Sequence, residues 1–236
     1  MTTDEHPPTV LLIAGYWLGA WAWDEVVEQL EAAGRRAVPL TLPGLDPEDA
    51  ERATRTLDDQ VDAVLEAASS EEHPVLLVAH SGANAPVSMV LDRRPDLVSR
   101  VVWVDSGPVA DGAVGSLPPE VADLPLPPFE ELAASASLEG LRAGQREAFR
   151  DRAVPQPGAA IRQPVALRND ARRSVPTTLV CCSISSEQLM DLARAGHPMF
   201  AEVALLTDLE LVDLPTGHWP MWSRPSDLAQ VLIEAS

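Results

Sequence analysis

The chain has 236 residues, of which 46% are hydrophobic and 22% charged, so it is long enough for one large domain with a buried core. Its formal net charge is -19, and all 17 basic residues are arginines. This charge repels a phosphate backbone and an anionic lipid surface, and no apolar run approaches the roughly 20 residues of a membrane-spanning helix. Nucleic acid and membranes are therefore excluded as expected partners.

The cellular compartment is predicted from the N-terminus and the cysteines. The first eight residues, M-T-T-D-E-H-P-P, lack the basic and apolar regions of a secretory signal. Cys181 and Cys182 are adjacent in a predicted strand, where neighbouring side chains point to opposite faces, so no disulfide is expected. We expect a cytoplasmic protein, and the sequence leaves its oligomeric state open.

The first third of the chain alternates between strand and helix patterns. Residues 9–14 are a short apolar run that ends at Gly15, which is typical of a buried strand. Residues 20–33 form a helical pattern closed by Gly34, and residues 37–40 form a second strand. A loop rich in Pro, Gly and Asp follows.

The alternation continues to residue 104. Thr56 begins a helix with a predicted capping box, residues 75–79 form the third strand, residues 83–92 a helix and residues 98–104 the fourth strand. Alternation of this kind predicts a parallel sheet with helices on both faces.

Residues 107–174 interrupt this pattern. They are rich in Pro, Ala, Gly and Glu, with helical pieces and no strand signal, so we expect a small helical cap inserted over the sheet. The pattern resumes with a strand at 177–182, a helix at 186–196, a strand at 209–214 and a last helix from about Pro225. The sequence thus predicts one α/β domain over residues 1–236, with about six mainly parallel strands.

The third strand ends in A-H-S-G-A, residues 79–83. A serine between small residues on a tight turn from strand to helix is typical of a nucleophile, because the backbone there is strained and crowded. A serine that caps the following helix explains the same pattern, so this motif alone does not distinguish a nucleophile from a helix cap at Ser81. His218 follows the last strand in the loop P-T-G-H-W-P, at the sheet edge where ligands of open α/β sheets bind.

The order of these motifs resembles the α/β-hydrolase superfamily along nearly the whole chain. The motifs are the first strand with Gly15 and its aromatic loop, L-P-G at residues 42–44, A-H-S-G-A, and G-H-W-P. The segment W-L-G-A-W-A-W-D is similar to the small esterase and hydroxynitrile-lyase branch. The resemblance implies an α/β-hydrolase fold.

The resemblance also implies roles for single residues. Ser81 is expected to be the nucleophile and His218 the general base that later protonates the leaving group. The backbone N–H groups of Tyr16 and Gly82 are expected to form the oxyanion hole. Ala14 stands where the family commonly has a histidine, which leaves a backbone donor intact.

The acid that would orient His218 has more than one candidate. The strand at 177–182 is followed by S-I-S-S-E-Q, without the aspartate that the family usually places there. Asp105, at the end of the strand before, is the favoured acid, Glu187 is the alternative, and a site without an acid also remains open.

Aromatic residues beside these motifs are expected to line a pocket for an apolar group. Tyr16, Trp17 and Trp219, together with His80, are the predicted substrate-binding residues, and Tyr16 therefore has two expected roles. Five scattered histidines do not predict a metal site, and no glycine-rich nucleotide motif is present, so no metal and no cofactor are expected.

Three functions follow as hypotheses. The favoured one is a serine hydrolase that cleaves a small, mostly apolar carboxylic ester or lactone through an acyl-enzyme. The second is a lyase that uses the same serine and histidine to move a proton without acylation, as the hydroxynitrile-lyase resemblance implies. The third is a ligand-binding protein without catalysis.

Overall fold

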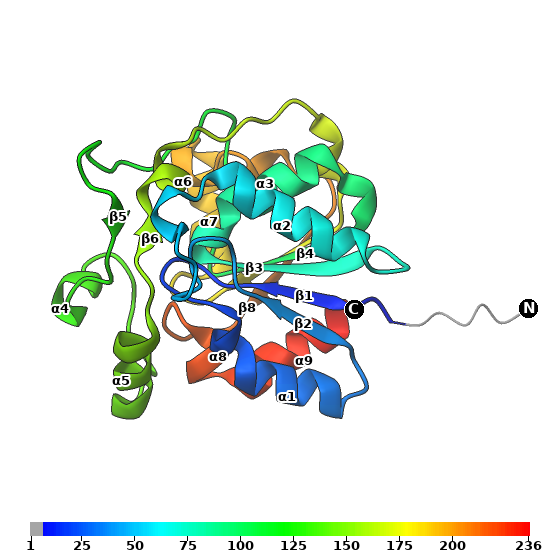
Figure 1. Ribbon diagram of the computed structural model, residues 1–236. Helices are drawn as coiled ribbons and strands as arrows, with labels where there is room; N and C mark the ends of the chain where they lie inside the picture. The colour runs from blue at the N-terminus through cyan, green and yellow to red at the C-terminus, as the bar shows by residue number, and fades with distance from the viewer. Residues whose placement is uncertain (1–6) are drawn as a thin grey trace, which may run out of the picture.

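The computed structural model describes residues 7–236 and contains a six-stranded parallel sheet between two layers of helices (Figure 1). The strands run in the order β2-β1-β3-β4-β7-β8, with every neighbouring pair parallel. Their bounds are β1 Val10–Ile13, β2 Ala37–Leu40, β3 Val75–His80, β4 Val98–Val104, β7 Thr177–Cys181 and β8 Leu209–Asp213. The predicted fold class is confirmed, although residues 1–6, part of the segment inspected for a secretory signal, lie outside the described residues.

Helices cover both faces of the sheet. Figure 1 shows α2 and α3 above the sheet and α1 and α9 below it. The helices are α1 Asp24–Ala32, α2 Leu57–Ser69, α3 Asn84–Arg93, α4 Phe129–Leu132, α5 Ala143–Arg152, α6 Gly158–Arg162, α7 Ser186–Arg194, α8 Pro220–Ser223 and α9 Pro225–Ala235. No helix within residues 7–236 is both long and apolar enough to cross a membrane.

The central strands are apolar on both sides because helices bury both faces. In β1, Leu11 and Ile13 belong to one hydrophobic core and Val10 and Leu12 to the other. The two free cysteines follow the same alternation, since Cys181 lies in the first core and Cys182 in the second. Neighbouring residues of a strand therefore serve opposite cores, as the predicted pattern requires.

Two predicted helices can be compared in detail. The capping box of α2 is confirmed, because Thr56 accepts a hydrogen bond from the backbone of Asp59 while the Asp59 carboxylate accepts one from the backbone of Thr56. The helix predicted over residues 20–33 begins instead as a 3₁₀ turn, Ala20–Trp23, before α1. Turns of this type are frequent at the start of α-helices.

The segment between β4 and β7 departs from the prediction in one respect. Residues 107–174, called the insertion below, contain α4, α5 and α6, and also a short antiparallel pair formed by β5 (Asp123–Leu124) and β6 (Gln156–Pro157). A two-residue strand is too short to produce a periodic pattern in the sequence. Figure 1 shows β5, β6, α4 and α5 beyond the carboxyl ends of the parallel strands.

The order of the strands places the loops after β1 and β3 on either side of a crevice. β1 has β2 on one side and β3 on the other, so the chain first extends the sheet in one direction and then in the opposite one. At such a switch point the loops after the two strands diverge and leave a crevice at the carboxyl edge. Tyr16 follows β1 and Ser81 follows β3, so both lie at this edge.

Candidate active site

Ser81 occupies a strained turn between β3 and α3. Its φ angle is 51°, in the left-handed region that residues other than glycine rarely adopt. Gly15 lies so close that a Cβ there would be 2.8 Å from the Ser81 Cβ and 3.0 Å from the backbone oxygen of His80. The crowding explains why small residues surround this serine.

His218 lies in the loop between β8 and α8, and its side chain reaches Ser81. The distance from His218 Nε2 to Ser81 Oγ is 2.7 Å. The backbone N–H of His218 donates to the carbonyl of Ser137 at 2.8 Å, so the insertion holds the histidine loop. The imidazole and the hydroxyl are thus already within hydrogen-bonding distance of each other.

Asp105, which follows β4, is the carboxylate that contacts His218. Its Oδ2 lies 2.6 Å from His218 Nδ1 and accepts a 2.5 Å hydrogen bond from the Ser183 hydroxyl. Its Oδ1 accepts the backbone N–H groups of Cys182 and Ser183 at 3.1 and 2.8 Å. Glu187, the alternative acid, lies exposed in the first turn of α7.

The charge of Asp105 fixes the tautomer of the histidine. Burial raises the pKa of Asp105, but the hydrogen bonds from His218 and Ser183 outweigh this effect and lower the pKa to about 2. An ionised carboxylate accepts only, so His218 Nδ1 carries the proton. Nε2 is then free to accept the proton of the Ser81 hydroxyl.

A cavity of about 460 Å³ opens beside these three side chains. Its walls come from the loops after β1, β3, β4, β7 and β8, from the insertion, from α7, and from the segment between α7 and β8. The lining residues are Tyr16, Ser81, Gly82, Asn84, Asp105, Ser106, Gly107, Ser135, Ala136, Ser137, Val180, Cys181, Ser183, Ile184, Leu189, Met199, Phe200 and His218. Serines dominate the insertion side of the cavity, and apolar side chains dominate the side formed by α7 and the segment after it.

Comparison with protein families shows to which family the chain belongs. A model described as the alpha/beta hydrolase family matches residues 10–231. The chain belongs to the alpha/beta hydrolase family. It is 31% identical to methylesterase 7 of Arabidopsis thaliana over 95% of this chain and 94% of that protein. It is 26% identical to a carbendazim hydrolyzing esterase of Nocardioides sp. over 94% of this chain and 97% of that protein.

Other relatives match over a shorter stretch. Alignments with three further methylesterases of Arabidopsis thaliana cover only 30%, 41% and 30% of those proteins. Among solved structures, an extracellular alpha/beta-hydrolase from a Paenibacillus species superposes with a TM-score of 0.77 and 19% identity, over 98% of this chain and 99% of that one. At this identity, the likeness shows the fold.

In this alpha/beta hydrolase, Tyr16 and Gly82 lie against each other beside Ser81. A Cβ on Gly82 would be 2.4 Å from Cδ1 of the Tyr16 ring, so the ring packs directly on the residue after the serine. Burial raises the pKa of Tyr16, which keeps its hydroxyl protonated. The two residues expected to donate to an oxyanion are therefore neighbours at the cavity wall.

Three of the four residues expected to bind substrate do not line the cavity. Trp17 Nε1 donates to the carbonyl of Leu124 at 2.9 Å, and Trp219 is 2% exposed, with its ring packed between those of His218 and Phe149. These tryptophans hold the insertion and the histidine loop in place. Trp17 and Trp219 were expected in the cavity because they adjoin Tyr16 and His218 in the sequence, but successive side chains point in different directions.

His80, the third of these residues, is 1% exposed and lies behind the serine. Burial, followed by electrostatic repulsion between the two imidazoles, lowers the pKa of His80 to about 3, so its imidazole is neutral. Its Nδ1 accepts the backbone N–H of Gly15 at 3.3 Å, and its Nε2 donates to the backbone oxygen of His218 at 2.8 Å. It therefore connects the loops that carry Tyr16 and His218.

Several cavity residues had no signal in the sequence. Ser183 lies two residues after β7, and its backbone and hydroxyl donate to Asp105. Met199 and Phe200 line the cavity from an irregular segment whose position depends on distant contacts. Within residues 7–236, no group of three or more His, Cys, Asp or Glu side chains is arranged to hold a metal ion.

Proposed function

We propose that this protein is an ester hydrolase that cleaves a small, mostly apolar, uncharged carboxylic ester or lactone through an acyl-enzyme on Ser81. The observation that carries the proposal is the continuous set of hydrogen bonds from Ser81 to His218 to Asp105 at the wall of a cavity. The similarity to methylesterase 7 over nearly the whole chain supports the reaction class. No cofactor is required for this chemistry.

The first half of the reaction forms the acyl-enzyme. His218 Nε2 takes the proton of the Ser81 hydroxyl while Oγ attacks the ester carbonyl carbon. The backbone N–H groups of Tyr16 and Gly82 stabilise the negative oxygen of the tetrahedral intermediate. When the intermediate collapses, the C–O bond to the alcohol breaks, and the imidazolium gives its proton to the departing oxygen.

The second half releases the acid. Water enters, His218 accepts a proton from it, and the resulting hydroxide attacks the acyl carbon. Collapse of the second intermediate returns the proton to Ser81 Oγ and frees the carboxylic acid. Throughout, Asp105 remains ionised and stabilises the imidazolium at Nδ1.

The lining of the cavity supports an uncharged substrate. The lining residues within the described chain include no arginine, and the sequence contains no lysine, so a carboxylate on the substrate would have no cationic partner. The net charge of -19 also repels anions at long range. Ile184, Leu189 and Phe200 offer apolar surface, which replaces the mainly aromatic pocket that the sequence predicted.

The insertion is proposed to act as a cap on this cavity. Ser135, Ala136 and Ser137 come from the insertion and line the cavity opposite α7. The proposed location of the protein is the cytoplasm, in keeping with two free and buried cysteines.

Labelling with a fluorophosphonate, followed by peptide mapping, tests the nucleophile. This reagent reacts with serines activated by a base and an oxyanion hole, so we expect a single adduct on Ser81. The adduct is expected to disappear in Ser81→Ala and His218→Ala. Ser226→Ala, at an exposed serine in the first turn of α9, is the matched control and should label as the wild type does.

The other hypotheses predict different results. A lyase would turn over its substrate without an acyl group ever appearing on Ser81 in a rapidly quenched reaction. A protein that only binds its ligand would gain thermal stability from the ligand without turnover. The contact between Asp105 and His218 supports a catalytic site over a protein that only binds its ligand.

A further inference from the structure

The segment between α7 and β8 forms one wall of the cavity and is held by few buried side chains. It consists of two 3₁₀ turns, Pro198–Phe200 and Val203–Leu205. Met199 and Phe200 in the first turn line the cavity, and Met199 is 69% exposed. Within residues 195–208, all of which the structure describes, only Glu202 and Val203 are buried.

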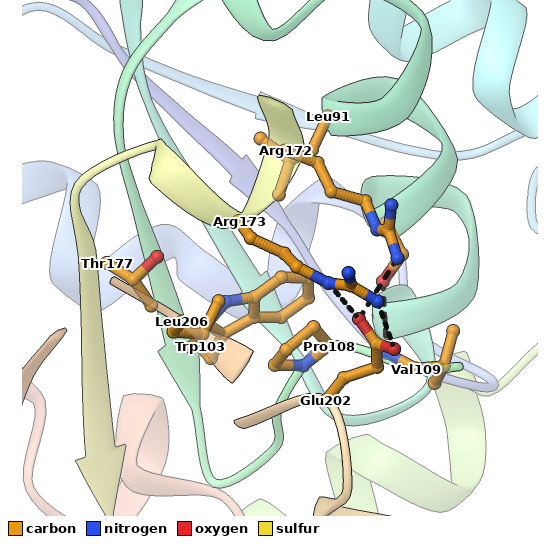
Figure 2. A pocket seen from close by; sticks show the side chains of 10 residues that line it. Leu91, Trp103, Pro108, Val109, Arg172, Arg173, Thr177, Glu202 and Leu206 are labelled. Carbon is orange, nitrogen blue, oxygen red and sulfur yellow. Dashed lines mark hydrogen bonds and ion pairs between the residues drawn. The ribbon is translucent and has the colours of Figure 1, made fainter. Parts of the chain in front are cut away.

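Glu202 attaches this segment to the body of the protein through two arginines. Arg172 Nη2 lies 3.2 Å from Glu202 Oε2, and Arg173 Nη2 lies 3.1 Å from Oε1. Figure 2 shows both guanidinium groups converging on the Glu202 carboxylate beside Trp103 of β4. The side chains of Arg172 and Glu202 are only 9% and 10% exposed, so solvent screens this pair weakly.

The arginines are themselves fixed. The 3₁₀ turn Asp170–Ser174 that carries them leads directly into β7. Arg172 donates to the backbone oxygen of Asn169 at 2.9 Å and also lies 3.8 Å from the carboxylate of Asp92 in α3. Glu202 is therefore held by two arginines at the end of the insertion, in a turn that lies two residues before β7 and is tied to α3 through Asp92.

We propose that Glu202 is a positioning residue for substrate specificity, whose ion pairs with Arg172 and Arg173 hold Met199 and Phe200 as the apolar wall for the larger group of the ester. This inference rests on the proposed function. Glu202 lies three residues after Met199 and two after Phe200, so displacement of its carboxylate moves both side chains. Esters with a long apolar chain depend on this wall, whereas the smallest esters do not reach it.

A purely stabilising role for the ion pairs predicts a different outcome. Loss of a buried ion pair lowers stability wherever it occurs, and it would then reduce the turnover of all esters by the same factor. A positioning role changes the ratio between long and short esters. The ratio of kcat/KM for p-nitrophenyl hexanoate to that for p-nitrophenyl acetate therefore separates the two roles.

The variant that tests this is Glu202→Gln, which keeps the shape of the side chain and removes its charge. We expect kcat/KM for the hexanoate to fall about tenfold, mainly through KM, while that for the acetate stays within about twofold. Glu71→Gln is the matched control. Glu71 pairs with Arg36 beyond the amino ends of the strands, so the same chemical change occurs far from the cavity and should leave the ratio unchanged.

Amide hydrogen exchange gives a second readout that needs no turnover. Peptides covering residues 197–206 are expected to exchange faster in Glu202→Gln than in the wild type, with the central strands unchanged. Phe200→Ala alone should lower the ratio of kcat/KM for the hexanoate to kcat/KM for the acetate. It should add little in combination with Glu202→Gln, because both changes remove the same wall.

The outcomes distinguish this inference from the function on which it rests. A wild-type protein that hydrolyses neither ester contradicts the proposed function. A wild-type protein that hydrolyses both, with an unchanged ratio and unchanged exchange in Glu202→Gln, overturns the role of Glu202 alone. Equal losses for acetate and hexanoate also overturn it, since they indicate a stabilising role only.

Discussion

His80 Nε2 donates a hydrogen bond of 2.8 Å to the backbone oxygen of His218. On the other side of the same ring, Nδ1 accepts the N–H of Gly15. One neutral, fully buried imidazole thus joins the loop that carries the proposed base to the loop that carries a proposed oxyanion donor. Neither contact touches the substrate cavity, so His80 acts through the residues it positions.

Two variants separate the contacts of His80. His80→Gln can place an N–H near the position of Nε2, and His80→Asn can place an oxygen near the position of Nδ1. Because the contact with His218 is the shorter one, we expect His80→Asn to lose more kcat than His80→Gln, by about tenfold, with KM changed less than about threefold. Steady-state kinetics on p-nitrophenyl acetate measures this. Equal kcat values in the two variants would contradict the assignment.

The central strands could be predicted from the sequence because β1, β3 and β7 are buried along their whole length. The strand predicted over residues 98–104 coincides with β4. A strand that is buried on both faces has a continuous run of Val and Leu, and a turn signal follows it. Both features are local, so they can be recognised in the sequence. The position of Ser81 followed as well, because it comes directly after β3, and His218 was found in the loop that follows β8.

The sequence favoured Asp105 as the acid but left Glu187, or no acid at all, open. That choice depends on which strand end faces His218, and the strand order β4-β7-β8 becomes known only when the sheet is assembled. The apolar wall was missed for a similar reason. Glu202 meets Arg172 across 30 residues, and no local pattern records that contact.

Because the Tyr16 ring packs on Gly82, we expect the effect of Gly82→Ala on kcat/KM to depend on the presence of that ring. Gly82→Ala places a methyl group 2.4 Å from the original position of the Tyr16 ring, so the ring must move away from the serine. We expect kcat/KM to fall at least about tenfold. In the Tyr16→Ala background the same substitution should cost much less, because the space is empty, and a double-mutant cycle measures the difference.

The control for Gly82→Ala is Gly144→Ala. A Cβ on Gly144, in the first turn of α5, would meet no atom within 4 Å. Activity should be unchanged, and the free energy of unfolding should rise by about 0.5 kcal/mol or more because alanine favours a helix. Additive effects of Gly82→Ala and Tyr16→Ala would show that the ring does not decide the outcome.

Gly217 is the point at which the insertion touches the histidine loop. A Cβ there would be 2.4 Å from the backbone oxygen of Glu139 and 2.7 Å from that of Ser137. Gly217→Ala must therefore separate the two segments and weaken the hydrogen bond from the backbone of His218 to Ser137. We expect kcat to fall about tenfold or more, with faster hydrogen exchange over residues 135–140. Wild-type kcat would rule out this coupling.

The contact between Asp105 and His218 predicts which carboxylate matters for catalysis. Asp105→Asn keeps the side-chain size, and asparagine tolerates the φ of 44° at this position, but the charge that fixes the tautomer is lost. We expect kcat to fall by about 10³ to 10⁴, as for loss of the acid in comparable triads. Glu187→Gln, at an exposed carboxylate, should retain wild-type kcat. A reversed order of the two variants would move the role to Glu187.

The same carboxylate makes stability depend on pH. The pKa of Asp105 is about 2 in the folded protein, against an ordinary value of 3.8, so the unfolded chain takes up a proton more readily than the folded one. Its contribution is therefore complete above about pH 5 and is lost as the pH falls from about 5 through 2. The shift corresponds to about 2 kcal/mol.

Urea denaturation of the wild type and of Asp105→Asn at several pH values measures this contribution, since the pH effects of other carboxylates cancel in the difference. We expect the free energies of unfolding to differ most at pH 6 and the difference to shrink by about 2 kcal/mol at pH 2. Because the variant cannot titrate at residue 105, a difference that stays constant over this range would contradict a depressed pKa. The lower stability of Asp105→Asn would then result from lost packing contacts, because the energy of such contacts does not change with pH.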